Sequence, residues 1–259
     1  MSGISGVSST YSYGSYAQIA SGKRINTAAD DAAGLAIAEE ENSYVNGLNA
    51  GSNNMESAKD MLNISDSAAS SITDYLQRIK ELSVQASNSA LMSSSDLKKI
   101  QDEIDQLKQG ISDVASQTTY NTHTLLDGTD TDYELATNAE GSTTTVSTGN
   151  MTLEALGIAD YDVTGDFDMS VIDDAIEAVS SQRSSMGAQS NALEYAVNVN
   201  NTTAYNATST LSRIEDLDYP QAIEERKKQE ALQAYSLMMQ KKEEEEEQRR
   251  SQNLFTTSI

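Results

Sequence analysis

Apolar residues recur every seventh position along a long stretch of the chain, between residues 45 and 87. One series consists of Leu48, Met55, Leu62, Ala69 and Leu76, and the second, later in each heptad, consists of Ala58, Ser65, Ile72, Ile79 and Ala86. This spacing is typical of the seam of a coiled coil. A helix over these residues is about 64 Å long at ~1.5 Å per residue. That length exceeds an ordinary small domain, so the pattern predicts a rod.

Further segments repeat the helical period. After a Ser-rich break at residues 88–95, apolar residues spaced by three and four predict a helix from Asp96 to about Gln117. The short connection favours antiparallel packing of this helix on the first. Residues 170–216 and 221–250 predict two more helices. The sum is an elongated antiparallel bundle of long helices whose N- and C-terminal segments meet at one end.

The N-terminal part of the chain has a different amino-acid composition. Residues 1–22 are rich in Ser, Gly and Tyr, which predicts weak structure. Thr27 follows as the predicted N-cap of a helix with Asp30 and Asp31 in its first turn, where the helix dipole favours anions.

Residues 120–165 interrupt the helical pattern with many Thr, Gly, Asn and Asp. Residues 133–136 and 143–146 predict the two strands of a β-hairpin around a four-residue loop, Asn138 to Gly141. Met151 to Leu156 predicts a short helical turn that ends at Gly157.

Composition narrows the possible functions. The chain has 259 residues, no Cys or Trp, two Phe and one Pro, and its 37% apolar content lies below the ~45–50% typical of globular domains. The formal net charge of −23 makes nucleic acid and anionic membranes poor partners. No apolar run is long enough to cross a membrane, and the N-terminus does not resemble a cleavable secretory signal. If the protein is exported, we expect another route.

Several blocks of the sequence resemble bacterial flagellin. They are residues 21–39 (SGKRINTAADDAAGLAIAE), 76–88 (LQRIKELSVQASN), 96–107, 116–128, 172–195 and 211–219. The resemblance implies a structural subunit that polymerises into the extracellular flagellar filament for motility. It also implies export through the flagellar type III apparatus without a cleaved signal. The large variable outer domains of the family are missing, which indicates a short form.

The resemblance implies a division into five regions. These are a divergent N-terminal segment at 1–25, rod helices at 26–119, a short outer β region at 120–165, a C-terminal rod helix at 166–219 and a charged C-terminal helix at 220–259. Only twenty residues precede Ser21, and a KKEEEEEQRR run interrupts the last helix. These departures leave open a non-polymerising paralogue that acts as a secreted binding, capping or receptor-engaging protein.

Two surfaces are candidates for contacts with partners. The resemblance assigns Arg78, Leu82 and Glu103 to the contact between subunits, which the host flagellin-sensing toll-like receptor also reads; the alternative is an exposed ion pair beside a core leucine. The apolar patch near the C-terminus resembles the segment that the flagellar export chaperone wraps, and it could equally pair with the N-terminal segment. Its residues are Leu232, Tyr235, Leu237, Met238 and Met239. Hook-filament junction and cap proteins are further expected partners.

No catalytic, cofactor or metal site is predicted. His123 is the only histidine and has no companions for general-base chemistry or metal binding. The acidic run of Asp127, Asp130, Asp132 and Glu134 lacks the glycine and the closing glutamate of an EF-hand, so a solvated turn is the favoured interpretation. We therefore expect a protein that is not an enzyme.

Overall fold

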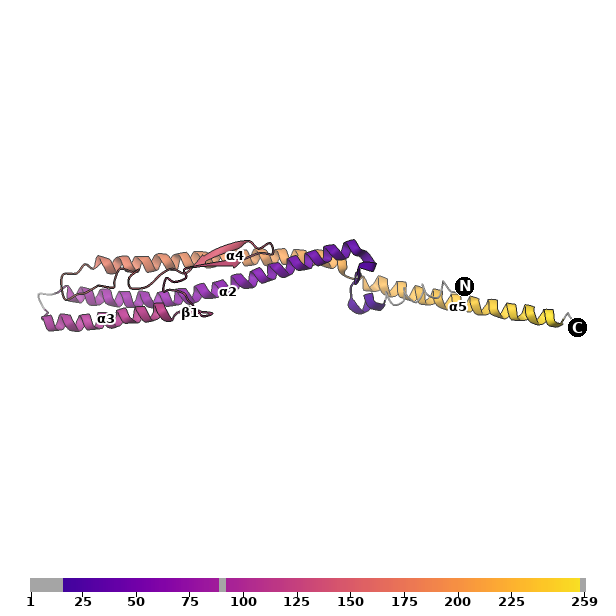
Figure 1. Ribbon diagram of the computed structural model, residues 1–259, viewed down its shortest axis with the longest axis horizontal. Helices are drawn as coiled ribbons and strands as arrows, with labels where there is room; N and C mark the ends of the chain where they lie inside the picture. Colours follow the sequence, from indigo (N-terminus) through magenta and orange to yellow (C-terminus); the bar gives the residue numbers. More distant parts are fainter. Residues whose placement is uncertain (1–15, 89–91, 257–259) are drawn as a thin grey trace. The chain divides into compact units, whose positions relative to one another are not determined.

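The computed structural model describes residues 16–88 and 92–256, apart from the side chains of residues 251–256. The chain divides into two compact units. The central unit is Tyr44–Tyr205, and the terminal unit combines Met1–Ser43 with Asn206–Ile259. The helices are α2 (Ala28–Ala86), α3 (Ser94–Gln117), α4 (Ser170–Glu215) and α5 (Tyr219–Thr256) (Figure 1).

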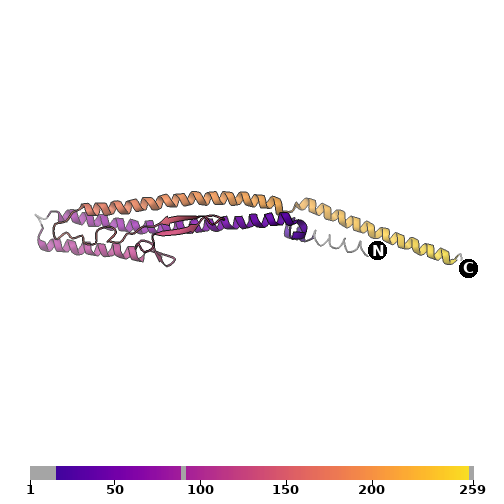
Figure 2. The ribbon, with the colours of Figure 1, turned by 45° about the horizontal axis from the view of Figure 1, so that its top comes forward.

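The central unit is built on antiparallel helices. Lys59 and Asp66 of α2 pair with Glu194 and Arg183 of α4 at 3.0 and 2.8 Å, so residue numbers rise along one helix as they fall along the other. Arg78 of α2 reaches Glu103 of α3 at 2.8 Å. Figure 2 shows the three helices of this unit running side by side.

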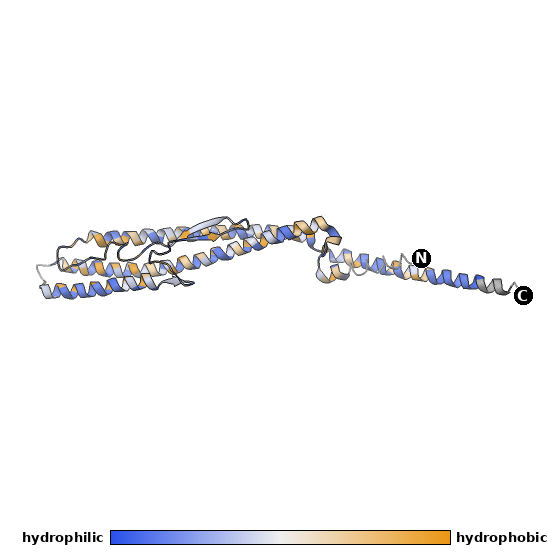
Figure 3. Cartoon of the chain, in the orientation of Figure 1, coloured by the Kyte–Doolittle hydropathy of each residue, from blue (hydrophilic) through white to orange (hydrophobic). Residues whose placement is uncertain are grey.

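Both predicted heptad series lie in the core. Their ten residues are buried, including Ser65, whose hydroxyl donates to the carbonyl of Met61 within the same helix. From α4, Ile172, Val179, Met186 and Leu193 are buried against them, as the spacing of seven predicts. In α3 the seam is less complete, because Ile100, Ile104 and Ile111 are buried while its other members are half-buried. Figure 3 shows hydrophobic and hydrophilic residues interleaved along these helices.

The start of α3 is set by a capping box. The hydroxyl of Ser93 accepts from the backbone N–H of Asp96, and the carboxylate of Asp96 accepts from the backbone N–H of Ser93. Asp96 is therefore the third residue of the helix. The sequence pattern predicts a helix that begins at Asp96, whereas α3 begins two residues earlier, at Ser94. Two otherwise unpaired N–H groups are satisfied this way.

The predicted β-hairpin is confirmed. Strand β3 (Asp132–Ala136) pairs antiparallel with β4 (Thr143–Ser147), with Tyr133 opposite Val146. A second pair, β1 (Thr119–Tyr120) and β2 (His123–Thr124), was not predicted. Its turn residues, Asn121 and Thr122, have φ values of 47° and 72°. Threonine rarely adopts positive φ angles, so the Asn121-Thr122 pair does not match the turn sequences from which a hairpin is predicted.

The hairpin loop packs closely on two glycines of α2. A Cβ at Gly51 would lie 2.4 Å from the carbonyl oxygen of Thr137, and a Cβ at Gly47 would lie 2.7 Å from the Cα of Ala139. Glycine in a helix interior is destabilising by about 1 kcal/mol relative to alanine, yet α2 continues through both positions. Their role is to admit the backbone of the loop.

The chain between β4 and α4 contributes a further layer to the core. The turn that follows Met151 ends as expected at Gly157, whose φ is 70°. The N–H of Ile158 donates to Leu153 and that of Gly157 to Glu154, which is the pattern of a Schellman motif. Ile158 is fully buried as a result.

The terminal unit begins with a kinked helix start. Asp31 has extended backbone angles inside α2, and its carboxylate accepts from the backbone N–H of Gly34 at 2.9 Å. Thr27 directly precedes Ala28, the first residue of α2, so it lies at the predicted N-cap position, and Asp30 accepts from its N–H at 2.9 Å and from its hydroxyl at 3.1 Å. After the kink, Asp31 acts as a second cap that starts the long part of the helix.

Segments from the two halves of the sequence meet within the terminal unit. The N–H of Arg24 donates to the carbonyl of Glu215 at 2.6 Å, and the N–H of Leu217 donates to that of Gly22 at 2.9 Å. Lys23 pairs with Glu215 at 2.5 Å. The predicted meeting of the terminal segments is confirmed.

Helix α5 starts directly after this meeting point. The carbonyl of Asp218 accepts from Ala222, and Pro220 occupies the first turn, where a missing N–H costs nothing. Residues 16–21 are also helical, so weak structure is the wrong prediction for them, while residues 1–15 lie outside the described part.

The predicted fold class is confirmed: the protein is mainly α, with long antiparallel helices and small β pairs. Among the described residues, no helix combines the length and apolar character that a membrane span needs.

Candidate functional site

Arg78 is the centre of an exposed ionic cluster on α2 and α3. Its Nε and Nη2 donate to the same carboxylate oxygen of Glu103, at 3.0 and 2.8 Å, and its Nη1 donates to Glu81 at 2.9 Å. Hydrogen bonding to Glu103, followed by that to Glu81, raises the pKa of Arg78. The guanidinium is thereby held in one orientation while its side chain stays 48% exposed. We call Arg78, Glu81 and Glu103 the Arg78 cluster.

Leu82 does not share this surface. Its side chain is 2% exposed and belongs to the hydrophobic core of the central unit. The geometry of the single chain therefore matches the alternative stated from the sequence, an exposed ion pair beside a core leucine. A partner that reads this face meets the charged side chains, and the role of the surface in subunit or receptor contacts stays a prediction.

Glu81 was missed by the sequence analysis. It lies three residues after Arg78, a spacing that places both side chains on one helical face, so the i,i+3 rule offered a signal. Its carboxylate doubles the negative charge around the guanidinium. The bond to Glu103, twenty-five residues away, needs the α2–α3 packing to form.

The C-terminal apolar patch lies on α5. All five of its residues, Leu232, Tyr235, Leu237, Met238 and Met239, are exposed. For the part of the N-terminal segment that the structure describes, from residue 16 onward, contacts occur nearer the start of α5, where Tyr219 donates to the carbonyl of Ile19 at 2.9 Å and Arg226 lies 5.3 Å from the ring of Tyr16. The patch itself is available to a partner, and both uses stated from the sequence remain predictions.

The acidic run after β2 is divided among separate hydrogen bonds. Asp127 accepts from the Thr124 hydroxyl at 2.6 Å and from the Thr129 N–H at 2.9 Å, which together lower the pKa of its carboxyl. The hydroxyl of Ser147 donates to Asp132. Within the described ranges, no group of three or more His, Cys, Asp or Glu side chains is placed to hold a metal ion.

His123 lies beside the same run. Its Nδ1 is 3.7 Å from a carboxylate oxygen of Asp130, and its ring meets that of Tyr133 edge to face. This arrangement suits a structural histidine of β2 that helps to place the hairpin.

Taken together, these features define a helical structural protein that interacts through exposed charged and apolar surfaces. The family model of the bacterial flagellin N-terminal helical region matches residues 9–131, and that of the bacterial flagellin C-terminal helical region matches residues 169–253. The chain belongs to the bacterial flagellin family. Its function is accordingly that of a structural subunit of the flagellar filament.

Individual relatives agree with this assignment. The chain is 34% identical to a flagellin of Bacillus subtilis over 254 residues, covering 83% of each chain. It is 33% identical to the flagellar filament 33 kDa core protein of Treponema phagedenis, covering 83% of this chain and 82% of the relative. The crystal structure of Bacillus cereus flagellin superposes with a TM-score of 0.50 at 26% identity, over 57% of this chain and 88% of that one.

Proposed function

We propose that this chain polymerises with copies of itself into an extracellular flagellar filament. Its terminal segments take part in assembly, and the protein acts as a structural subunit and not as an enzyme. The pairing of Gly22 and Arg24 with Leu217 and Glu215 carries this proposal. It joins the two family regions into one unit, so a single chain presents both to its neighbours.

Filament growth requires a contact that does not close on itself. Such a contact uses two different patches of one subunit, and repetition then generates a helix of subunits. We infer that the Arg78 cluster is one of these patches, because its guanidinium is pre-oriented and less rotamer entropy is lost on docking. The same cluster is the proposed recognition surface for the host flagellin-sensing toll-like receptor.

The test of assembly is electron microscopy of the purified protein after the salt concentration is raised, with and without sheared seeds of a conventional flagellin. Filaments from the protein alone support the proposal. The absence of filaments under both conditions contradicts the proposal. It would favour the alternative of a non-polymerising paralogue, which no observation on the structure or the relatives supports.

The Arg78 cluster is tested by Arg78→Ala and Glu103→Ala, with Lys98→Ala on the exposed face of α3 as the matched control. We expect both cluster variants to weaken assembly and receptor signalling, while the control retains both. Leu82 is unsuitable for this test, since truncation of a buried leucine costs about 2–5 kcal/mol of stability and confounds the result. Unchanged assembly and signalling in both cluster variants would exclude this surface.

We further propose that the C-terminal patch binds the flagellar export chaperone before assembly and packs in the filament afterwards, with the junction and cap proteins as neighbours at the filament ends. Its exposed apolar side chains support this, because such a patch needs cover. Leu237→Ser with Met238→Ser is expected to reduce chaperone pull-down, whereas Glu244→Ser is not. Equal chaperone capture by both variants argues against this site.

Export through the flagellar apparatus without cleavage is a related proposal. It is checked by the intact mass of the extracellular protein in cells with and without a working export apparatus. A shortened mass, or export without the apparatus, contradicts it.

A further inference from the structure

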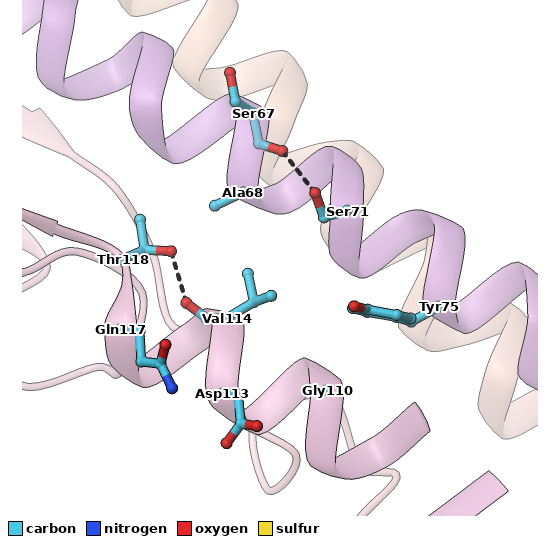
Figure 4. A pocket seen from close by; sticks show the side chains of 9 residues that line it. All are labelled: Ser67, Ala68, Ser71, Tyr75, Gly110, Asp113, Val114, Gln117 and Thr118. Atoms are coloured by element: carbon cyan, nitrogen blue, oxygen red, sulfur yellow. Dashed lines mark hydrogen bonds between the residues drawn. The ribbon is translucent and has the colours of Figure 1, made fainter. Parts of the chain in front are cut away.

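A groove of about 480 Å³ lies between α2 and α3 in the central unit. Ser67, Ser71 and Tyr75 line it from α2, and Gly110, Asp113 and Val114 line it from α3. Figure 4 shows Tyr75 and Val114 pointing into the space between the two helices. We call this the α2–α3 groove.

Gly110 keeps the groove open. A Cβ at this position would lie 3.2 Å from the ring of Tyr75, so a larger residue would push the ring aside. The Tyr75 hydroxyl has no hydrogen-bond partner among the described residues. Asp113 is the only charged residue in the lining, and Gln109 donates to one of its carboxylate oxygens at 2.9 Å. The groove thus places the apolar side chains of Ala68 and Val114 beside polar groups that can bind a phenol.

A matching projection lies on α4. Tyr195 and Val199, one turn apart, are 74% and 64% exposed, while Leu193 and Val197 on the opposite side of the helix are buried in the core. Residues 195–212 contain no Asp, Glu, Lys or Arg, although charged residues make up 22% of the chain. Exposed aromatic and aliphatic side chains on a charge-free face are typical of an interaction surface.

Charge selects which surfaces of two copies can meet. Each copy carries a net charge of −23, so most juxtapositions bring like charges together. The Tyr195 face adds no charge, and the groove adds only Asp113, whose carboxylate can accept from a phenol hydroxyl. A contact between them therefore brings a single charge, that of Asp113, into the interface and avoids repulsion between like charges at close range.

The positions of the two surfaces also suit a repeating contact. The Lys59–Glu194 ion pair places Tyr195 close to the level of Lys59, and Ser71 lies twelve residues further along α2. The projection and the groove are thus about 18 Å apart along the helix axis at ~1.5 Å per residue. Because the projection and the groove are two different patches of one copy, the contact can repeat from copy to copy without closing, with successive copies offset along the axis.

We propose that Tyr195 of one copy, with Val199 beside it, docks into the α2–α3 groove of a neighbouring copy in the filament. This inference rests on the proposed function, because it names one of the contacts through which copies polymerise. It assigns a partner, a second copy of this chain, to two surfaces that the Arg78 cluster does not include.

The absence of cysteine makes a direct test possible. Two single variants, Ser71→Cys and Asn191→Cys, are mixed with wild-type chain, assembled and mildly oxidised with diamide. Asn191 is exposed one turn before Tyr195 on the same face of α4, so this variant keeps the docking side chain. Each variant has one thiol, so every disulfide joins two copies. Linked peptides are identified by mass spectrometry. The matched control pairs Ser71→Cys with Ser181→Cys, which lies exposed on α4 about three turns from Asn191.

A disulfide needs Cα atoms within about 7 Å, so we expect the 71–191 link to exceed the 71–181 link by at least ~10-fold in filaments. The 71–191 link should be missing from unassembled protein at the same concentration. Filaments without the 71–191 link, or with equal amounts of both links, overturn the docking contact while leaving the proposed function intact. Failure of wild-type chain to form filaments overturns the proposed function and the contact with it.

Discussion

The side-chain amide of Asn200 on α4 donates to the backbone carbonyl of Thr137 in the hairpin loop at 2.7 Å, and the same nitrogen lies 3.4 Å from the carbonyl of Leu48 on α2. One buried side chain thus ties the loop to both helices. The neighbouring Ser52 donates to Asn201 at 3.3 Å, which adds a second link between α2 and α4 at this level.

Replacement of Asn200 by alanine should lower the free energy of unfolding by about 1–3 kcal/mol, because it removes the side-chain donor to the part-buried carbonyl of Thr137. Chemical denaturation followed by circular dichroism measures this. Asn198→Ala, on the exposed side of the same helix, should change stability by no more than about 0.5 kcal/mol. Equal losses in the two variants would show that the amide contacts are unimportant.

Two helix-interior glycines should respond to alanine in opposite directions. At Gly187 an added Cβ meets nothing within 4 Å, so Gly187→Ala should stabilise the protein by about 0.5–1 kcal/mol through helix propensity. At Gly51 the Cβ would lie 2.4 Å from the Thr137 oxygen, so Gly51→Ala must displace the loop and should destabilise the protein. Thermal melting of both variants decides the matter, and a rise in Tm for Gly51→Ala would contradict the close packing.

Stability should fall in acid. Hydrogen bonds to their charged forms lower the pKa of five aspartates, Asp30, Asp96, Asp127, Asp162 and Asp168. A carboxyl with a lower pKa in the folded chain adds stability above its unfolded pKa of about 3.9 and loses it as the pH falls through the folded value. The Tm should therefore be nearly constant from pH 7 to about pH 5 and drop below about pH 4.

Asp127→Asn provides the control for this pH dependence. It removes one titrating group while keeping an oxygen that can accept from Thr124 and Thr129, so its Tm should fall less steeply in acid than that of the wild type. A Tm that rises below pH 4, or an unchanged slope in the variant, would be inconsistent with the assignment.

Assembly should be promoted by salt. Subunits with a net charge of −23 repel one another, and the Debye length falls from about 10 Å at 0.1 M to about 3 Å at 1 M ionic strength. The critical concentration, measured by sedimentation, should decrease over this range. A critical concentration that increases with salt would indicate that ion pairs such as those of the Arg78 cluster dominate assembly.

The sequence alone determined the helical plan. Leu48, Met55 and Leu62 predict an apolar seam because a helix brings side chains seven residues apart to the same face. This holds whichever segment the helix packs against. The hairpin was equally local, since its strands are adjacent in sequence and joined by a short loop. The resemblance to flagellin rested on blocks of sequence that can be recognised without a structure.

Tertiary structure alone decided how these elements use their side chains. Leu82 and Arg78 are four residues apart and predicted to share a surface, yet packing of α2 in the core buries one and exposes the other. Asp31 became a second cap because the chain must kink to bury Ile25, which packs where Gly34 has no Cβ. The glycines at 47 and 51 and the Tyr75–Gly110 contact likewise have meaning only against segments distant in sequence, which no local pattern specifies.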